Sequence, residues 1–205
     1  MPGYELFGAE ERKEVNDVLE TGILMRYGFD GPRKGIWKAK ELEEAICSRF
    51  GCDHAQLVSS GTAALTTALS ALGIGYGDEV ILPSFTFVAS FEAVISVGAI
   101  PVMVDIDETL TLNPDAVRNA ITPKTKCIMP VHMCGSMADL DALKAICKEF
   151  NFVLLEDACQ SIGGTYKGKQ LGTIGDAGTF SFDFVKTMTC AEAGVVMTNR
   201  EDVFI

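Results

Sequence analysis

The chain has 205 residues, of which 48% are hydrophobic, and it carries a formal net charge of -11. This apolar content excludes a disordered chain and suffices for one sizeable core, or for one domain with an appendage. The strong negative charge argues against nucleic acid or an anionic membrane as a partner.

The N-terminal quarter of the chain predicts helices joined by a surface loop. Residues 9–20 form a charged, helical-looking segment, and residues 21–34 are glycine-rich and predict a loop. Residues 38–50 carry apolar side chains at helical spacing and end before Gly51, a typical helix stop. Residues 1–50 therefore predict an N-terminal helical segment or arm.

Beyond this segment, short apolar runs alternate with helical stretches. This alternation, with short connections, predicts an α/β fold: a three-layer sandwich around a mostly parallel central sheet, in one large domain over residues 51–205. No helix is expected after Asp157. The expected strands are 56–58, 79–82, 100–104, 127–130, 152–155, 179–182 and 194–198, and the expected helices are 62–72, 87–97, 114–121 and 139–150.

Neither a targeting segment nor a membrane span is expected. The N-terminus has no basic region followed by an apolar stretch, and the most apolar segment, 80–104, is interrupted by two prolines and a glutamate. We therefore expect a cytoplasmic protein.

The seven cysteines are odd in number and lack close CxxC spacing, and His54 and His132 lie far apart in the sequence, so we expect reduced thiols and no metal.

The glycines at positions 73, 75 and 77 resemble part of a dinucleotide-binding fingerprint. That fingerprint follows a strand and opens a helix, whereas these glycines follow a helix and lead into a strand. The segment therefore predicts a turn and argues against a nicotinamide cofactor.

Three elements carry chemistry in combination. Ser59–Ala63 lies between a short strand and a helix, where backbone N–H groups can bind an anion, although for this element alone a plain helix cap is the better explanation. Residues 152–157 form an apolar strand that ends in two acids, at the edge where α/β sheets place ligands, although an ordinary polar turn could follow. Lys186 follows another apolar strand beside Phe184 and Val185, which could desolvate the amine, lower its pKa and make it a nucleophile toward an aldehyde. A lone lysine is usually a surface residue, so the signal comes from the order of all three.

In this order the sequence resembles the DegT/DnrJ/EryC1/StrS sugar aminotransferases, which are fold-type I enzymes that depend on pyridoxal phosphate (PLP). The resemblance runs from about Leu6 to the end of the chain. The motifs that carry it are Ser60-Gly61-Thr62-Ala63-Ala64-Leu65, Gly77-Asp78-Glu79-Val80-Ile81, Pro83-Ser84-Phe85-Thr86-Phe87, Glu156-Asp157-Ala158-Cys159-Gln160 and Ser181-Phe182-x-x-x-Lys186.

The resemblance implies a role for each matching position. Lys186 matches the catalytic lysine that binds the cofactor's aldehyde, and Asp157 matches the acid beside the pyridine nitrogen. Gln160 matches a position near the 3-hydroxyl, and Phe87, with Phe85 as an alternative, matches the aromatic residue that stacks on the ring. The positions that match the phosphate-binding group are Ser60, Gly61, Thr62 and Ser181.

The chain departs from the family pattern in two respects. Relatives usually read Gly-Glu-Gly-Gly after the lysine, where this chain reads Ala191-Glu192-Ala193-Gly194; if the first or third position needs a positive φ, alanine there is strained. Relatives are also nearly twice as long, so the resemblance implies that a smaller C-terminal domain is absent from this chain.

The resemblance implies transfer of an amino group from glutamate to a keto-sugar by a homodimer. The acceptor would be a nucleotide-linked keto-sugar or, from residues 1–8, 131–137 and 181–187, an oxidised octulosonate of lipopolysaccharide. Three alternatives remain: a truncated, cofactor-binding or regulatory chain with weak catalysis, a fragment that binds nothing stably, and a PLP-dependent sugar dehydratase of the same fold. The dehydratases carry histidine in place of the lysine.

Overall fold

The computed structural model describes residues 3–204 of the chain. Met1, Pro2 and Ile205 lie outside the described residues. Two expectations involve the first two positions: that the N-terminus carries no secretion signal, and part of the octulosonate resemblance. Both therefore lie partly outside the described residues.

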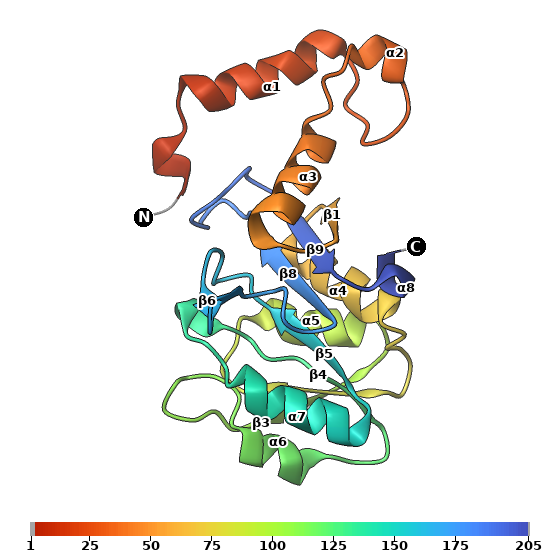
Figure 1. Cartoon of the computed structure of the whole chain (residues 1–205), viewed down its shortest axis with the longest axis vertical. Coiled ribbons are helices and arrows are strands. Elements are labelled where there is room, and N and C mark those ends of the chain that lie inside the picture. The colour runs from red at the N-terminus through yellow and green to blue at the C-terminus, as the bar shows by residue number, and fades with distance from the viewer. Residues whose placement is uncertain (1–2, 205) are drawn as a thin grey trace.

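A central sheet organises the chain (Figure 1). Over residues 3–204 it has seven strands in the order β1-β9-β8-β5-β4-β2-β3. Strand β9 is antiparallel to both its neighbours, and the other neighbouring pairs are parallel, as expected for a mostly parallel sheet. The strands are β1 His54–Val58, β2 Glu79–Pro83, β3 Ile100–Val104, β4 Thr125–Ile128, β5 Val153–Asp157, β8 Ala177–Ser181 and β9 Gly194–Thr198.

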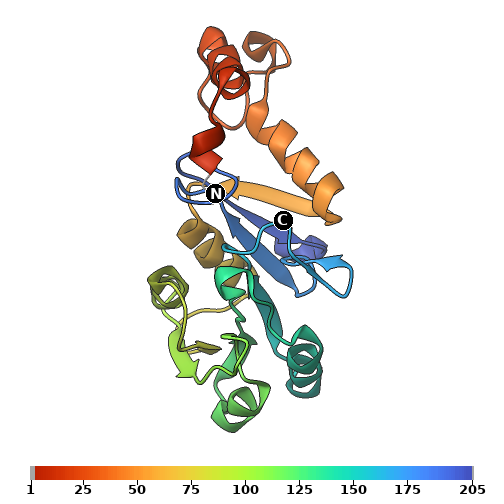
Figure 2. The same cartoon turned by 90° about the vertical axis from the view of Figure 1, so that its left-hand side faces the viewer.

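Helices cover both faces of this sheet and complete three layers. Helices α4 and α5 lie on one side, and α3 and α7 lie on the other (Figure 2). The expected three-layer α/β architecture is confirmed. The helices are η1 Gly3–Leu6, α1 Ala9–Thr21, α2 Asp30–Arg33, α3 Lys38–Phe50, α4 Gly61–Ala71, α5 Val88–Ser96, α6 Pro114–Ala120, η2 Met133–Gly135, α7 Leu140–Phe150 and α8 Glu201–Phe204.

Alternation along the buried strands builds two separate cores. Ile81, Ile128 and Leu154 point into the cluster beneath α3, α6 and α7. Leu82 and Leu155, one residue further along their strands, point into the cluster beneath α4 and α5. Because successive strand side chains face opposite sides, both faces of the central strands are buried and the strands read as continuous apolar runs.

Three short elements differ from the expected pattern. A helix after Asp157 was not expected, and α8 shows that this was wrong; its four residues are too few to display a helical period. The glycine-rich stretch before β8 contains a hairpin of β6 Thr165–Tyr166 and β7 Lys169–Gln170. Helix α2 lies within the expected loop 21–34.

The N-terminal residues lie to one side of the sandwich. Helices α1 and α2 project beyond the sheet (Figure 1), and none of the thirteen residues of α1, all of them described, is buried. By contrast, Ile46 of α3 is 2% exposed and belongs to the core under α3, α6 and α7. We therefore use the term arm for residues 7–37 and propose that α3 belongs to the sandwich.

Other expectations concern features outside the sandwich core. The glycine segment between α4 and β2 is a turn, with Gly73 at φ +78° and Gly77 at φ +84°. All seven cysteines lie among the described residues, and none forms a disulfide. Within residues 3–204, no helix is long and apolar enough to cross a membrane.

Candidate active site

A cavity of about 580 Å³ opens between the C-terminal ends of β5 and β8 and the N-terminus of α4. Side chains from several distant segments line it. They include all eight residues singled out from the sequence: Ser60, Gly61, Thr62, Phe87, Asp157, Gln160, Ser181 and Lys186.

Asp157 ends strand β5 and points to the α4 and α5 side of the sheet. Its side chain is nearly buried, with the residue 4% exposed. Oδ2 accepts a hydrogen bond of 2.7 Å from Ser90 Oγ, and Oδ1 accepts one of 3.2 Å from the Cys159 backbone N–H. A carboxylate offers about four acceptor positions, so Asp157 can accept further donors from a molecule in the cavity.

The N-terminus of α4 supplies donors on the wall of the same cavity. Ser60 is the N-cap, and its Oγ accepts from the Ala63 N–H at 3.0 Å. The N–H groups of Gly61 and Thr62 begin the helix and have no intrahelical partner, which makes the helix start an anion site. The expected helix cap is therefore present at this turn, and the N–H groups beside it are suited to the expected anion.

Gly61 is required where α4 meets the end of β8. A Cβ on this glycine would lie 2.8 Å from Ser181 Cβ and 3.2 Å from Cys159 Sγ. Only glycine therefore lets the start of α4 approach the Ser181 side chain so closely. The Ser181 hydroxyl faces the same cavity and accepts from the Asp183 N–H at 3.3 Å.

Lys186 returns to the cavity through a tight turn after β8. The Lys186 N–H donates to the Asp183 carbonyl at 2.9 Å, and Asp183 Oδ1 accepts from the Val185 N–H at 3.1 Å. Among residues 3–204, no hydrogen bond or ion pair involves Lys186 Nζ. The Lys186 side chain is half-buried, and its amine is available to a ligand.

The expected apolar flank of Lys186 forms only in part. Val185 lines the cavity but is 64% exposed, and Phe184 stacks instead on Tyr4 of η1, with ring centroids 4.5 Å apart. The Gly3 N–H also donates to the Lys186 carbonyl at 2.8 Å. The N-terminal segment therefore supports the lysine turn from outside, which the sequence did not indicate.

The remaining expected residues lie at the rim. Phe87 is the N-cap residue of α5, 60% exposed, and borders the cavity, whereas its alternative Phe85 does not line it. Gln160 also borders the cavity, and its Oε1 accepts from the Cys134 N–H at 3.1 Å. An aromatic ring and an amide thus lie at the edge of the same space.

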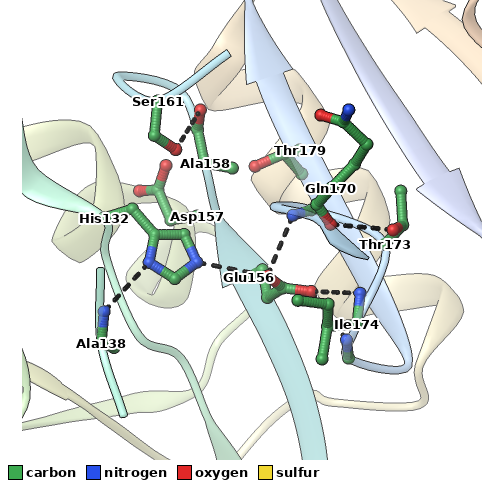
Figure 3. Close-up of polar contacts among 12 residues, drawn as sticks. His132, Ala138, Glu156, Asp157, Ala158, Ser161, Gln170, Thr173, Ile174 and Thr179 are labelled. Carbon is green, nitrogen blue, oxygen red and sulfur yellow. Dashed lines mark hydrogen bonds and ion pairs between the residues drawn. The ribbon is translucent and has the colours of Figure 1, made fainter. Parts of the chain in front are cut away.

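Glu156 precedes Asp157 and points to the opposite side of the sheet (Figure 3). It is fully buried, and its Oε1 accepts from the backbone N–H groups of Ile174 and Gly175 at 2.6 and 2.7 Å. Its Oε2 accepts from Gly172 N–H at 2.9 Å and lies 3.2 Å from His132 Nε2. Glu156 therefore fixes the loop that leads into β8.

His132 is also fully buried and joins this network through both ring nitrogens. The Ala138 N–H donates to Nδ1 at 3.3 Å, so Nδ1 carries no proton and Nε2–H is the donor to Glu156. Within the described residues, no group of three or more His, Cys, Asp and Glu is placed to hold a metal ion.

Ser90 and Cys159 are among the cavity-wall residues that the sequence did not single out. Ser90 is 1% exposed and bonds to Asp157; its only sequence signal is the three-residue spacing from Phe87, which places both on one face of a helical turn. Burial, and secondarily the Asp157 charge, raise the pKa of the Cys159 thiol well above its usual value. Cys159 therefore contributes a neutral wall to the cavity at physiological pH.

The departure at Ala191 has a structural consequence. Ala191 has φ +73°, in the left-handed region, whereas Ala193 does not have a positive φ. The first of the two alanines is therefore the strained one. The glycine that is retained, Gly194, is also required, since a Cβ there would lie 2.3 Å from the Ser60 carbonyl oxygen.

These groups suit a ligand with two charged ends. The N-terminus of α4 favours an anion, and the Asp157 carboxylate favours a protonated nitrogen. Between them, the Lys186 amine can add to an aldehyde. The donor set therefore fits a phosphorylated aromatic aldehyde with a basic ring nitrogen.

Comparison with known proteins agrees with this chemistry. The family model of the DegT/DnrJ/EryC1/StrS aminotransferase family matches residues 6–204. The solved structure of 3-amino-5-hydroxybenzoic acid synthase is 40% identical and superimposes with a TM-score of 0.88, covering 95% of this chain and 49% of that one.

Two further solved structures carry related ligands. DesV from S. venezuelae, in complex with a ketimine intermediate, is 37% identical with a TM-score of 0.89, over 98% of this chain and 52% of its own. NtdA from Bacillus subtilis, with bound cofactor PMP, is 34% identical with a TM-score of 0.79, over 93% of this chain and 43% of its own. The chain thus spans about half the length of the structures it matches.

Proposed function

Because the chain belongs to the DegT/DnrJ/EryC1/StrS aminotransferase family, we propose that its cavity binds PLP and serves transfer of an amino group to a keto-sugar. The observation that carries this proposal is the convergence of Lys186, Asp157 and the N-terminus of α4 on one cavity. PLP, when bound, supplies an aldehyde that links to amines and a ring that accepts electrons from a substrate carbon.

The eight cavity residues singled out from the sequence each have a role in this proposal. Lys186 Nζ would hold the cofactor through its aldehyde, and the free Lys186 amine would move a proton to or from the substrate's α-carbon. Asp157 holds the proton on the ring nitrogen. Phe87 covers the ring, and Gln160 donates near its 3-hydroxyl. The phosphate group is bound by the start of α4 and the hydroxyl beside it, through Ser60, Gly61, Thr62 and Ser181.

Reaction with the keto-sugar is favoured over dehydration. The sugar dehydratases of this fold carry histidine where this chain has Lys186. An aminotransferase needs the lysine amine, because this amine holds the cofactor between reaction cycles. We propose glutamate as the amino donor. We also propose as acceptor either a nucleotide-linked keto-sugar or an oxidised octulosonate, as used by 8-amino-3,8-dideoxy-manno-octulosonate aminotransferase in lipopolysaccharide synthesis in the cytoplasm.

A titration with PLP tests the cofactor. We expect visible absorbance from the lysine-bound cofactor, and borohydride reduction should leave the cofactor's mass on the peptide that contains Lys186. Lys186→Ala should abolish both signals, whereas Lys148→Ala, an exposed lysine of α7, should leave them unchanged. Labelling of other lysines with equal yield would overturn the assignment.

Addition of glutamate then separates turnover from binding alone. An active chain converts its bound cofactor to the amine form and releases 2-oxoglutarate, which a coupled dehydrogenase assay detects. A chain that retains PLP but shows no glutamate-dependent spectral change is a cofactor-binding or regulatory protein. A chain that takes up no PLP has neither activity.

We also propose that the chain forms a homodimer. The arm and η1 carry exposed apolar side chains, among them Leu19, Leu24 and Tyr27, which are 57%, 74% and 67% exposed. Large exposed apolar residues gathered on one segment are typical of protein interfaces. Sedimentation velocity should give a dimer, and Leu19→Glu with Leu24→Glu should shift it toward monomer, unlike a matched charge change at Tyr76.

A further inference from the structure

Ser90 and Asp157 form a buried pair at the floor of the cavity. Ser90 is 1% exposed and Asp157 is 4% exposed, and Ser90 Oγ lies 2.7 Å from Asp157 Oδ2. An ionised carboxylate only accepts hydrogen bonds, so the single hydroxyl proton of Ser90 belongs to Asp157. Hydrogen bonds to charged groups are stronger than neutral ones, so this contact holds the carboxylate in one orientation.

Thr86 extends the contact to the next side chain. Its Oγ1 lies 2.7 Å from Ser90 Oγ, and either atom could donate. Because Ser90 gives its proton to Asp157, Ser90 can only accept at this contact. Thr86 Oγ1 also lies 3.3 Å from the Phe87 carbonyl oxygen, so the shorter contact to Ser90 is the main one for its single proton. The three side chains thus form a hydrogen-bonded relay that ends at the Asp157 carboxylate.

This relay belongs to the same turn as the aromatic residue at the rim. Phe87 caps α5, and its carbonyl accepts from the Ser90 N–H at 3.1 Å. The first turn of α5 therefore sets the place of the ring that would cover the cofactor and of the hydroxyl that orients the acid below it. Both groups move together if α5 moves.

We propose that Ser90 is a positioning residue that aims the Asp157 carboxylate at the ring nitrogen of the cofactor, and that Thr86 fixes Ser90. This inference rests on the proposed function. Ser90 acts through Asp157, because its hydroxyl proton goes to Asp157 Oδ2, and Thr86 Oγ1 is its other side-chain partner among residues 3–204.

The test measures the PLP dissociation constant by absorbance titration, with a melting temperature for each variant. Ser90→Ala should weaken binding about tenfold, the size of one buried hydrogen bond to a charged group, and Ser90→Thr should restore most of it. Ser161→Ala is the matched control, because Ser161 is also buried but donates to the Ala158 carbonyl. It should lower the melting temperature comparably and leave PLP affinity unchanged.

A double-mutant cycle tests that Ser90 acts through Asp157. In the Asp157→Asn background, Ser90→Ala should change PLP affinity by less than about twofold, as expected for coupled residues. If Ser90→Ala does not fold, Thr86→Val keeps Ser90 in place and should weaken binding about threefold, since it removes one neutral hydrogen bond.

The outcomes separate this inference from the proposed function. If the wild-type chain takes up no PLP, the proposed function fails and this inference with it. If the wild type binds PLP and Ser90→Ala binds it equally well, only the role of Ser90 fails. A full Ser90→Ala effect in the Asp157→Asn background would likewise overturn it, because the serine would then act independently of the acid.

Discussion

Glu156 and Asp157 are consecutive acids at the end of β5, yet they face two different regions of the molecule. Glu156 points toward the loop before β8 and accepts from four donors: three backbone N–H groups and the His132 ring (Figure 3). Asp157 points into the cavity and accepts from two, Ser90 Oγ and the Cys159 N–H.

The difference teaches how to separate a structural acid from a ligand-binding one. A carboxylate has about four acceptor positions, so Glu156 is saturated by the protein, whereas Asp157 keeps capacity for a ligand. Both acids are almost fully buried, and burial alone would not distinguish them. The number of protein donors does.

The largest effect on folding should come from Glu156→Ala. Four buried donors lose their acceptor at about 1–3 kcal/mol each, so the unfolding free energy should fall by roughly 4 kcal/mol or more. Urea denaturation followed by circular dichroism measures this. Glu44→Ala, at an exposed position of α3, should stay within about 0.5 kcal/mol of the wild type. Equal stability of the two variants would contradict the structural role of Glu156.

Asp157→Asn should have the opposite profile. PLP affinity should fall roughly 10–100-fold, because a charge-assisted hydrogen bond to the ring nitrogen is lost. Stability in urea should fall by less than for Glu156→Ala, since the protein itself gives this side chain only two donors. A variant with normal PLP affinity and severe destabilisation would place Asp157 in the same structural class as Glu156.

His132→Phe should sharpen the comparison from the structural side. It removes the Nε2–H donor of Glu156 and the acceptor of the Ala138 N–H, which we expect to lower stability by about 2 kcal/mol. His132→Gln can replace both hydrogen bonds in part and should lose less. PLP affinity, measured by titration below the melting transition, should change little in either variant, and a large change would link the two regions.

The smallest effect should come from Ala191→Gly, in the loop that follows Lys186. Relief of the left-handed conformation should raise stability by up to about 1 kcal/mol, partly offset by the greater chain entropy of glycine when unfolded. Ala193→Gly is the matched control without a positive φ and should lower stability by about 0.5–1 kcal/mol. Thermal unfolding in parallel decides the order, and a more stable Ala193→Gly would contradict it.

Much of the fold follows from local pattern. The expected strands 100–104 and 194–198 and the helix 38–50 agree with the structure in both bounds, because each is a short apolar run or an apolar stripe closed by a turn. The miss at α8 and the unanticipated hairpin of β6 and β7 involve elements of two to four residues. Elements this short show no measurable hydrophobic period, so the sequence pattern could not predict them.

By itself the sequence determined the order of strands and helices and the residues that motif spacing could single out, since these depend on the residues next to one another in the chain. The tertiary structure alone decided that Ser90 meets Asp157, that His132 meets Glu156, and that Ala191 rather than Ala193 is strained. Those pairs lie 67 and 24 residues apart, and such contacts depend on how strands are placed side by side. No local pattern of side chains encodes that placement.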